Sequence, residues 1–363
     1  MKILFVYQIC SFGGVETVLR NRAVGLRRLG HEPRIVLLED LGGQAVFAGL
    51  EDVEIAPGEA RLRDLLEDEA LDVVATIDTP SVAPLIARSR FRGRTVAEVH
   101  SNNFANMGYL GEVASSGADL LLFPSAYEAE LVRREYPAVA AAALPSVVVP
   151  NPVDTKLFRF TLPDRPALAP MIGWVGRLED QKNWRHFLEV AGAVARRRPQ
   201  TEFVVVGGLA APEVVKREFR ERVASLDLMG RLRWIPSLAY GRMPALYSAL
   251  AASGGALVPT SSFEPFGMTV LEAQACRCPV VASRTGGLAE LVVEGATGLG
   301  FEVDDTDGAS RQVLRVLDDA GLRAAVINGA SDAINARFAA EPVARAYVEA
   351  VSAGSGAQEG EDA

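Results

Sequence analysis

Short runs of apolar residues alternate along most of the chain with longer stretches of helical periodicity. In the first half, the apolar runs are rich in Val, Ile and Leu, which is typical of buried strands. They occupy residues 2–7, 33–38, 72–76, 94–99 and 120–123. Between the first two, residues 15–29 predict an amphipathic helix that ends at Gly30. This alternation predicts an α/β domain with a parallel, doubly wound sheet.

The alternation stops at a stretch rich in proline and then starts again. Pro150, Pro152 and several prolines between residues 161 and 170 interrupt the pattern, which is typical of a linker. We therefore place a first domain at residues 1–155 and a second α/β domain at residues 156–340. The second domain carries predicted strands at residues 171–175, 201–206, 231–235, 255–259 and 280–282, and predicted helices at residues 184–197 and 213–226.

The two ends of the chain differ from the domains. Residues 342–351 predict a last helix, and the Gly-, Ser- and Glu-rich residues 352–363 predict a disordered tail. The first apolar segment is too short for a signal peptide and predicts a strand of a cytoplasmic protein. The uncharged residues 243–263 contain prolines, glycines and serines, so we expect no integral membrane segment.

Composition and charge restrict the partners. The 363 residues include 37 basic and 46 acidic side chains, a net charge of −9, with 3 Cys and 3 His. Three cysteines cannot form a disulfide framework. The first 150 residues hold 14 basic and 20 acidic side chains, which disfavours nucleic acid or an anionic membrane surface as the main partner. The oligomeric state stays open.

The most informative segment is residues 260–273. A strand there ends in a serine-rich loop, and a helix is predicted to begin at Pro265 or Phe266, so unpaired amides near Gly267 favour phosphate binding. Glu264 and Glu272 lie about 12 Å apart along this helix, at roughly 1.5 Å per residue. That separation allows one carboxylate to meet a sugar and the other a ribose, with a diphosphate between them.

A second segment places two cations after a strand. Arg177 and Lys182 lie in one loop at the carboxyl end of the strand at residues 171–175, where open α/β sheets bind ligands. Together they are suited to neutralise a diphosphate, Arg through several donors and Lys as a point charge.

Two further candidates lie in the first domain. Gly13 and Gly14 form a turn between the first strand and the first helix, where a phosphate or a sugar oxygen can bind, but the full dinucleotide fingerprint is absent. His100 follows a strand and precedes Asn102 and Asn103, a hydrogen-bonding group typical of a site at a strand end.

Other chemistries are disfavoured. Cys276 and Cys278 have no further Cys or His nearby, so no metal site is expected. The motifs of P-loop nucleotide hydrolysis and of α/β-hydrolases are also absent.

Six motifs combine in this chain. They are Gly13-Gly14, Pro150-Asn151-Pro152-Val153-Asp154 with Phe158, Gly176-Arg177 followed by Lys182, Glu264 to Glu272, Pro279-Val280-Val281-Ala282-Ser283, and Gly286-Gly287 with Glu290, Gly295 and Gly298. Together they resemble the retaining glycosyltransferases of family 4. The resemblance extends to about Gly298.

The resemblance implies a GT-B fold, with two Rossmann-like domains whose parallel, doubly wound sheets face a central cleft. The second domain would bind a nucleotide-diphosphate-sugar such as a UDP-sugar, and the first would supply most of the acceptor site, with the last helix returning to it. The implied reaction transfers a sugar, of hexosyltransferase type, to an acceptor hydroxyl with retention of configuration. No cofactor and no metal would be needed, because the two cations stabilise the leaving diphosphate.

The resemblance also implies individual roles. Arg177 and Lys182 would hold the diphosphate, Glu272 the ribose and Glu264 a sugar hydroxyl, while His100 would contact the donor sugar near the reacting carbon. The backbone amides of Gly267, Met268, Thr269 and Val270 would complete the donor site. Gly13 and Gly14 would close on the diphosphate from the first domain, and Asn102 and Asn103 are acceptor candidates.

Two other functions remain open. One is a GT-B-like nucleotide-sugar epimerase or phosphorylase, and the other is a non-catalytic protein that binds sugar nucleotides. If the chain is a transferase, its acidic first half favours a neutral or cationic small acceptor, such as an aminocyclitol or another natural product, over an anionic lipid. A glycan acceptor also stays open.

Overall fold

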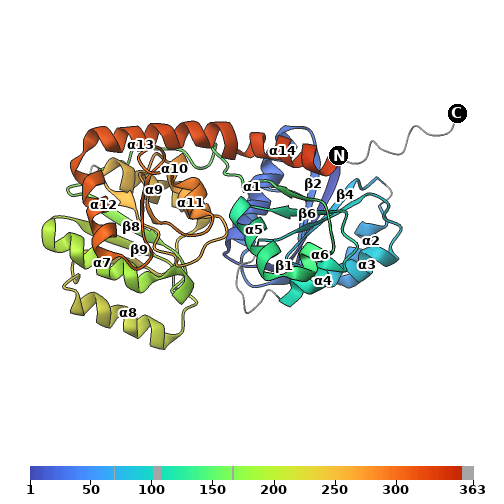
Figure 1. The fold of residues 1–363 in the computed structure, drawn as a ribbon, viewed down its shortest axis with the longest axis horizontal. Helices are drawn as coiled ribbons and strands as arrows, with labels where there is room; N and C mark the ends of the chain where they lie inside the picture. The colour runs from blue at the N-terminus through green and yellow to red at the C-terminus, as the bar shows by residue number, and fades with distance from the viewer. Residues whose placement is uncertain (69, 101–107, 166, 354–363) are drawn as a thin grey trace. The chain divides into compact units, whose positions relative to one another are not determined.

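The computed structural model describes residues 1–68, 70–100, 108–165 and 167–353, and the chain forms two compact units (Figure 1). The first unit consists of Met1–Asp154 together with the chain from Arg337 onward, and the second consists of Thr155–Ala336. The sequence predicts the corresponding boundaries after residues 155 and 340. A short π-helix at Ile334–Phe338 carries the chain from the second unit back into the first.

The first unit is built on a parallel sheet with the strand order β3-β2-β1-β4-β5-β6-β7. Its strands are β1 (Lys2–Cys10), β2 (Glu32–Asp40), β3 (Val53–Ile55), β4 (Val73–Ile77), β5 (Arg94–Glu98), β6 (Leu120–Phe123) and β7 (Ser146–Val148). Its helices are α1 (Gly14–Arg28), α2 (Gly58–Leu66), α3 (Ala83–Arg88), α4 (Leu110–Ala114), α5 (Ala126–Glu135), α6 (Pro137–Ala141) and α14 (Ala340–Ser352).

Both faces of this sheet are covered, because alternate residues of a strand point to opposite sides. Ile3 and Phe5 of β1 belong to a core that also contains residues of α1 and α14. Leu4 and Val6 belong to a separate core formed with α2 and α3. Two apolar faces explain why β1 is a nearly continuous apolar run.

Helix α14 packs directly on α1 within the first unit. Its Val343, Tyr347 and Val351 are buried in the same core as Leu19 of α1. The approach depends on Gly25, where a Cβ atom would lie 2.2 Å from the backbone oxygen of Ala340. The sequence predicts this helix at residues 342–351 and a tail from Ser352, but Ser352 is still helical. Residues 354–363 lie outside the described part of the chain.

The second unit has a parallel sheet of order β10-β9-β8-β11, and a parallel β12-β13 pair joins it through a bridge between Leu257 and Val280. Its strands are β8 (Met171–Val175), β9 (Glu202–Val206), β10 (Leu232–Ile235), β11 (Ala256–Leu257), β12 (Val281–Ser283) and β13 (Leu299–Phe301). Its helices are α7 (Trp184–Arg197), α8 (Glu213–Ser225), α9 (Met243–Ala252), α10 (Met268–Ala275), α11 (Leu288–Leu291), α12 (Thr306–Asp318) and α13 (Ala320–Ala333).

Both units thus have the α/β, parallel and doubly wound architecture that the sequence predicts. The strands that the sequence analysis missed are β3, β7 and β13, each of three residues, which is too short for a clear alternating pattern. In the described ranges, no helix combines the length and apolar character needed to cross a membrane.

Candidate functional site

In the second unit, the strand order reverses between β8 and β11, which lie side by side. The carboxyl ends of two such strands are the usual ligand-binding position of an open α/β sheet. The loop after β8 carries Arg177 and Lys182, and the loop after β11 carries Glu264. Three of the predicted site residues therefore come from this one edge of the sheet.

Lys182 and Glu264 form an ion pair at this edge. The Lys182 Nζ lies 2.5 Å from Glu264 Oε2, and the two side chains are 22% and 15% exposed. Ser261 Oγ donates to the same carboxylate oxygen over 3.3 Å. The Lys182 ammonium has three N–H donors, so it can bind an additional anion while it is paired with Glu264.

The backbones of the two loops are also joined. Ser262 N donates to Gln181 O at 2.9 Å, and Gln181 Nε2 donates to Phe263 O at 3.2 Å. Asn183 ends the first loop in the left-handed region, with φ of 51°, and is the N-cap residue of α7. These bonds join the backbones of the two loops that carry Lys182 and Glu264.

Arg177 behaves differently from Lys182. Its side chain is 67% exposed, and its Nη1 lies 2.9 Å from Glu179 Oε1 within the same loop. The structure brings Lys182 together with Glu264, whereas Arg177 is directed to solvent and to Glu179. An exposed arginine of this kind can reorient at little cost, since its ion pair is screened by water.

Helix α10 begins later than the sequence predicts. The predicted start was Pro265 or Phe266, but the helix begins at Met268, with Gly267 as its N-cap at φ of 114°. A Cβ at Gly267 would also lie 2.5 Å from Leu288 Cδ2. Val270 N donates to Gly267 O at 3.0 Å. The Val270 amide is thus engaged within the first turn in this conformation, and its contact with a ligand stays a prediction, as do those of Met268 and Thr269.

Glu272 lies in the interior, on α10. It is 5% exposed, and its Oε2 accepts a hydrogen bond from the Tyr247 hydroxyl at 2.9 Å. Burial raises the pKa of Glu272 to about 8, although the Tyr247 hydrogen bond acts in the opposite direction. A carboxyl group in this state is protonated for much of the time near neutral pH.

Two glycines that follow β12 fit closely against Glu264. Gly287 N donates to Glu264 O at 2.8 Å. A Cβ at Gly286 would lie 2.1 Å from that same oxygen. The sequence analysis used these glycines only as a family motif. The spatial reason for them, contact with the backbone of a site residue, is visible only in the structure.

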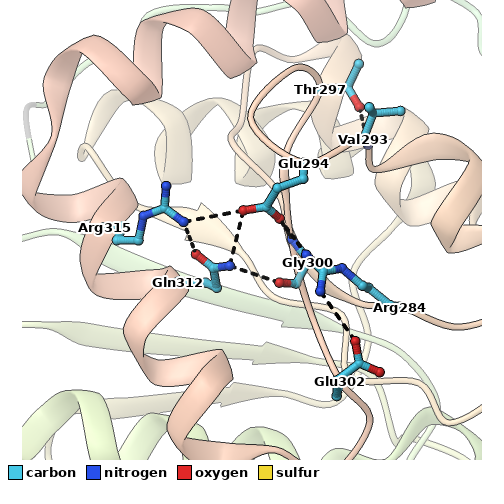
Figure 2. Close-up of polar contacts among 8 residues, drawn as sticks. All are labelled: Arg284, Val293, Glu294, Thr297, Gly300, Glu302, Gln312 and Arg315. Atoms are coloured by element: carbon cyan, nitrogen blue, oxygen red, sulfur yellow. Dashed lines mark hydrogen bonds and ion pairs between the residues drawn. The ribbon is translucent and has the colours of Figure 1, made fainter.

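Further along the chain, a cluster of polar contacts is centred on Glu294 (Figure 2). Glu294 Oε2 accepts from Gly300 N at 2.8 Å and from Arg284 Nη2 at 3.0 Å, and Glu294 Oε1 lies 3.3 Å from both Gln312 Nε2 and Arg315 Nη1. Burial acts to raise the pKa of Glu294, but these donors lower it overall. The cluster ties the segment after α11 to β13 and α12.

In the first unit, the order reverses between β1 and β4. The turn after β1 contains Gly13 and Gly14, and a carboxylate already lies against it. Glu16 Oε1 accepts from Ser11 N at 2.5 Å and from Ser11 Oγ at 2.6 Å. A Cβ at Gly13 would lie 2.5 Å from the other Glu16 oxygen. The turn is thus shaped around an anionic group, and that group is part of the chain.

His100 lies two residues beyond the end of β5 and is buried. Its backbone N–H donates to Asp78 Oδ1 at 2.8 Å, and its Nε2 lies 2.9 Å from Glu98 Oε2. The same Glu98 oxygen is paired with Arg22 of α1. The sequence analysis did not single out Glu98 or Arg22, because their pairing joins residues 76 positions apart. Asn102 and Asn103 lie outside the described residues.

The chain is similar to known proteins over most of its length. A family model described as "Glycosyl transferases group 1" matches residues 163–333, and a second, "Glycosyltransferase Family 4", matches residues 12–157. Sucrose synthase 1 of Zea mays is 31% identical over 174 residues, 46% of this chain and 21% of that protein. The D-inositol 3-phosphate glycosyltransferase of Salinispora tropica is 33% identical over 173 residues, 46% of this chain and 35% of that protein. The matches thus span about a fifth to a third of these relatives.

Solved structures resemble the chain over almost its whole length. The Anabaena protein HepE in complex with UDP and glucose has a TM-score of 0.78 at 21% identity, and the match covers 97% of this chain and all of that one. Sucrose-phosphate synthase from Thermosynechococcus elongatus has a TM-score of 0.74 at 20% identity, with 96% and 98% covered.

Proposed function

Because the chain belongs to the family 4 glycosyltransferases and has their GT-B fold, we propose that it transfers a sugar from a nucleotide-diphosphate-sugar to an acceptor hydroxyl with retention of configuration. One observation carries the proposal. Lys182 and Glu264, a cation for a diphosphate and a carboxylate for a sugar hydroxyl, lie 2.5 Å apart at the switch point between β8 and β11.

The donor proposal is a UDP-sugar. HepE, which shares the fold, was solved with UDP and glucose. In this chain, Lys182 would bind the diphosphate from its half-buried position, and Arg177 would turn from Glu179 to reach the same phosphates. The first-turn amides of Met268 and Thr269 would add donors, and Glu272 would accept a ribose hydroxyl.

The transition state that we propose has oxocarbenium character. The bond between the anomeric carbon and the diphosphate oxygen breaks, and the acceptor oxygen bonds to that carbon on the same face. The acceptor proton passes to the departing phosphate oxygen. Lys182 and Arg177 stabilise the negative charge that grows on the diphosphate, so that these two cations supply what a metal ion supplies elsewhere. His100 would contact the donor sugar near the reacting carbon, and Gly13 and Gly14 would approach the diphosphate.

For the acceptor, we propose a neutral or cationic small molecule such as an aminocyclitol or another natural product. The excess of acidic side chains in the first 150 residues, 20 against 14 basic ones, supports this choice. Negative charge disfavours a phosphorylated or anionic lipid acceptor through repulsion. The proposal therefore separates this chain from its Salinispora relative, whose name specifies an inositol phosphate.

Donor binding is tested by the melting temperature with UDP, GDP, ADP and dTDP. We expect UDP to raise it, and Lys182→Ala to remove most of the increase. Lys216→Ala is a matched control, because Lys216 is 19% exposed and also pairs with a glutamate, at 3.0 Å. An unchanged melting temperature with all four nucleotides would refute the donor proposal.

Products are then identified by mass spectrometry, with UDP-sugars and a panel of acceptors. Turnover without an acceptor would indicate an epimerase, and turnover that depends on inorganic phosphate would indicate a phosphorylase. Donor binding without any product would indicate a non-catalytic protein. A chelator should leave transfer unchanged, and loss of activity that added Mg²⁺ restores would contradict the metal-free mechanism.

A further inference from the structure

Strand β5 presents two functional side chains to the same face of the sheet. Glu98 is its last residue, and His100 follows two positions later, which places both side chains on one side. Helix α1 approaches that side and contributes Arg22. The three residues form a continuous chain of contacts from the core of the first unit to the strand end.

The ion pair within this chain is fully buried. The side chains of Arg22 and Glu98 are both 0% exposed, and the Arg22 guanidinium lies 4.7 Å from the centre of the Tyr347 ring. Among the residues that the structure describes, Arg22 Nε and Nη2 have no hydrogen-bond partner. Removing two charges from water is costly, and a well-packed apolar pair of similar volume is often at least as stable. Stability therefore does not account for the presence of this pair.

The pair does hold His100 in one orientation. Burial acts to raise the pKa of Glu98, but Arg22 and His100 together lower it to about 2, so the carboxylate is charged at neutral pH. A charged carboxylate only accepts hydrogen bonds, so the Nε2 atom that lies 2.9 Å from it carries the proton. The backbone N–H of His100 also donates to Asp78 Oδ1 at 2.8 Å.

We propose that Glu98 is a positioning residue for His100, and that Arg22 keeps Glu98 charged and in place. With Nε2–H engaged by Glu98, Nδ1 is the unprotonated nitrogen of the neutral ring and the one left to accept a hydrogen bond from the sugar. The inference deepens the proposed function and rests on it for the role of His100 at the reacting centre. Glu98 thus sets both the tautomer and the orientation of the His100 ring.

The first test does not depend on activity. The chain contains three histidines, so ¹H–¹⁵N spectra of the imidazole nitrogens can be assigned with a His100→Ala variant. We expect the wild type to show a single tautomer protonated at Nε2. In the double variant Arg22→Met with Glu98→Leu, we expect a mixture of tautomers, while the melting temperature stays equal or rises. A mixture in the wild type, or an unchanged tautomer in the double variant, would overturn the proposal.

The second test uses turnover of the donor that the wild type accepts. We expect the double variant to lose kcat by about tenfold to a hundredfold, at or below the lower end of acid–base effects because the ring itself remains, with donor KM changed less than about twofold. The single variant Glu98→Gln should keep much of the activity that the double variant loses, because its amide oxygen can also accept from Nε2–H. In a His100→Ala background, the double substitution should have no further effect on kcat.

The matched control replaces another ion pair of the first unit with the same residue types. Arg61 and Glu54 are 2.8 Å apart, and Arg61→Met with Glu54→Leu should leave kcat unchanged. If the Arg22 and Glu98 substitutions lower kcat equally with and without His100, the pair does not act through His100. If the wild type turns over no donor, the proposed function fails, but the tautomer test still decides on the positioning role.

Discussion

The ion pair between Lys182 and Glu264 predicts opposite effects of one substitution on two steps of the reaction. Glu264→Gln removes a negative charge from a position 2.5 Å from the Lys182 ammonium but keeps the size of the side chain. We expect UDP to bind more tightly, because the diphosphate no longer shares the ammonium with a carboxylate. We expect sugar transfer to fall, because the charged acceptor for the sugar hydroxyl is lost.

The size of the effect follows from the distance. A phosphate oxygen bound on the far side of the ammonium would lie about 6 Å from the Glu264 carboxylate. At that separation two unit charges repel by about 0.7 kcal/mol in water and by about 3 kcal/mol at an effective dielectric constant of 20. The pair is 22% and 15% exposed, so an intermediate value of about 1–2 kcal/mol applies. It corresponds to about fivefold to thirtyfold tighter binding of UDP.

Isothermal titration calorimetry with UDP measures the change in affinity directly. Product formation from a UDP-sugar measures the change in sugar transfer. Glu302→Gln is the control, because Glu302 pairs with Arg284 at 3.3 Å in the same unit but is 70% exposed. Equal or weaker UDP binding by Glu264→Gln would refute the reasoning, since it would show that Glu264 does not compete with the diphosphate. Unchanged transfer would refute its proposed contact with the sugar.

Three further predictions concern stability. Burial raises the pKa of both Glu128 and Glu272 to about 8, so the folded state holds more protons than the unfolded state between about pH 4.5 and 8. The free energy of unfolding should fall as pH rises through this range, by at most about 1.4 kcal/mol per pH unit for each group. Glu128→Leu should reduce this dependence on pH, as measured by urea denaturation at several pH values. Gly25→Ala should separate α14 from α1, because the new methyl group would overlap the Ala340 oxygen; faster amide hydrogen exchange in α14 would show it. Glu294→Ala should cost about 1–2 kcal/mol and lower the melting temperature, because four donors lose one acceptor.

Controls distinguish these effects from general damage. Glu130→Leu, on the exposed side of α5, should leave the pH slope unchanged. Gly30→Ala is strained by its φ of 82°, but its new methyl group would meet no atom of the described residues within 4 Å, so it should lower stability without releasing α14 selectively. Equal hydrogen exchange throughout the first unit in Gly25→Ala, or a stable Glu294→Ala, would contradict the corresponding prediction.

Much of the fold was accessible from local pattern. The apolar runs and helical stretches repeat at intervals that only a parallel α/β sheet accommodates, and the interruption at Pro150 and Pro152 marks the change of domain. Three-residue strands such as β13 have too few positions to show a period. The start of α10 was misplaced because Gly267 takes a left-handed conformation, which its neighbours in the sequence do not reveal.

The candidate site was only partly accessible. Loop residues at strand ends could be named, because a strand followed by glycine and charged residues is a local signal. The orientation of their side chains could not, and the structure directs Lys182 toward Glu264 while Arg177 stays 67% exposed. The supporting residues Tyr247 and Glu98 carry no local signal, since Tyr247 acts on Glu272 and Glu98 pairs with Arg22 from another element.

The sequence by itself determined which elements form and which chemistry lies at their ends, because hydrophobic periodicity and turn residues act over a few positions. Only the tertiary structure decided which of those ends meet and which charges are paired. Lys182 meets Glu264 across 82 positions and Arg22 meets Glu98 across 76, because strand order and helix packing set these distances. The electrostatic state of the site depends on such contacts, since burial and a partner's charge set the ionisation of each group.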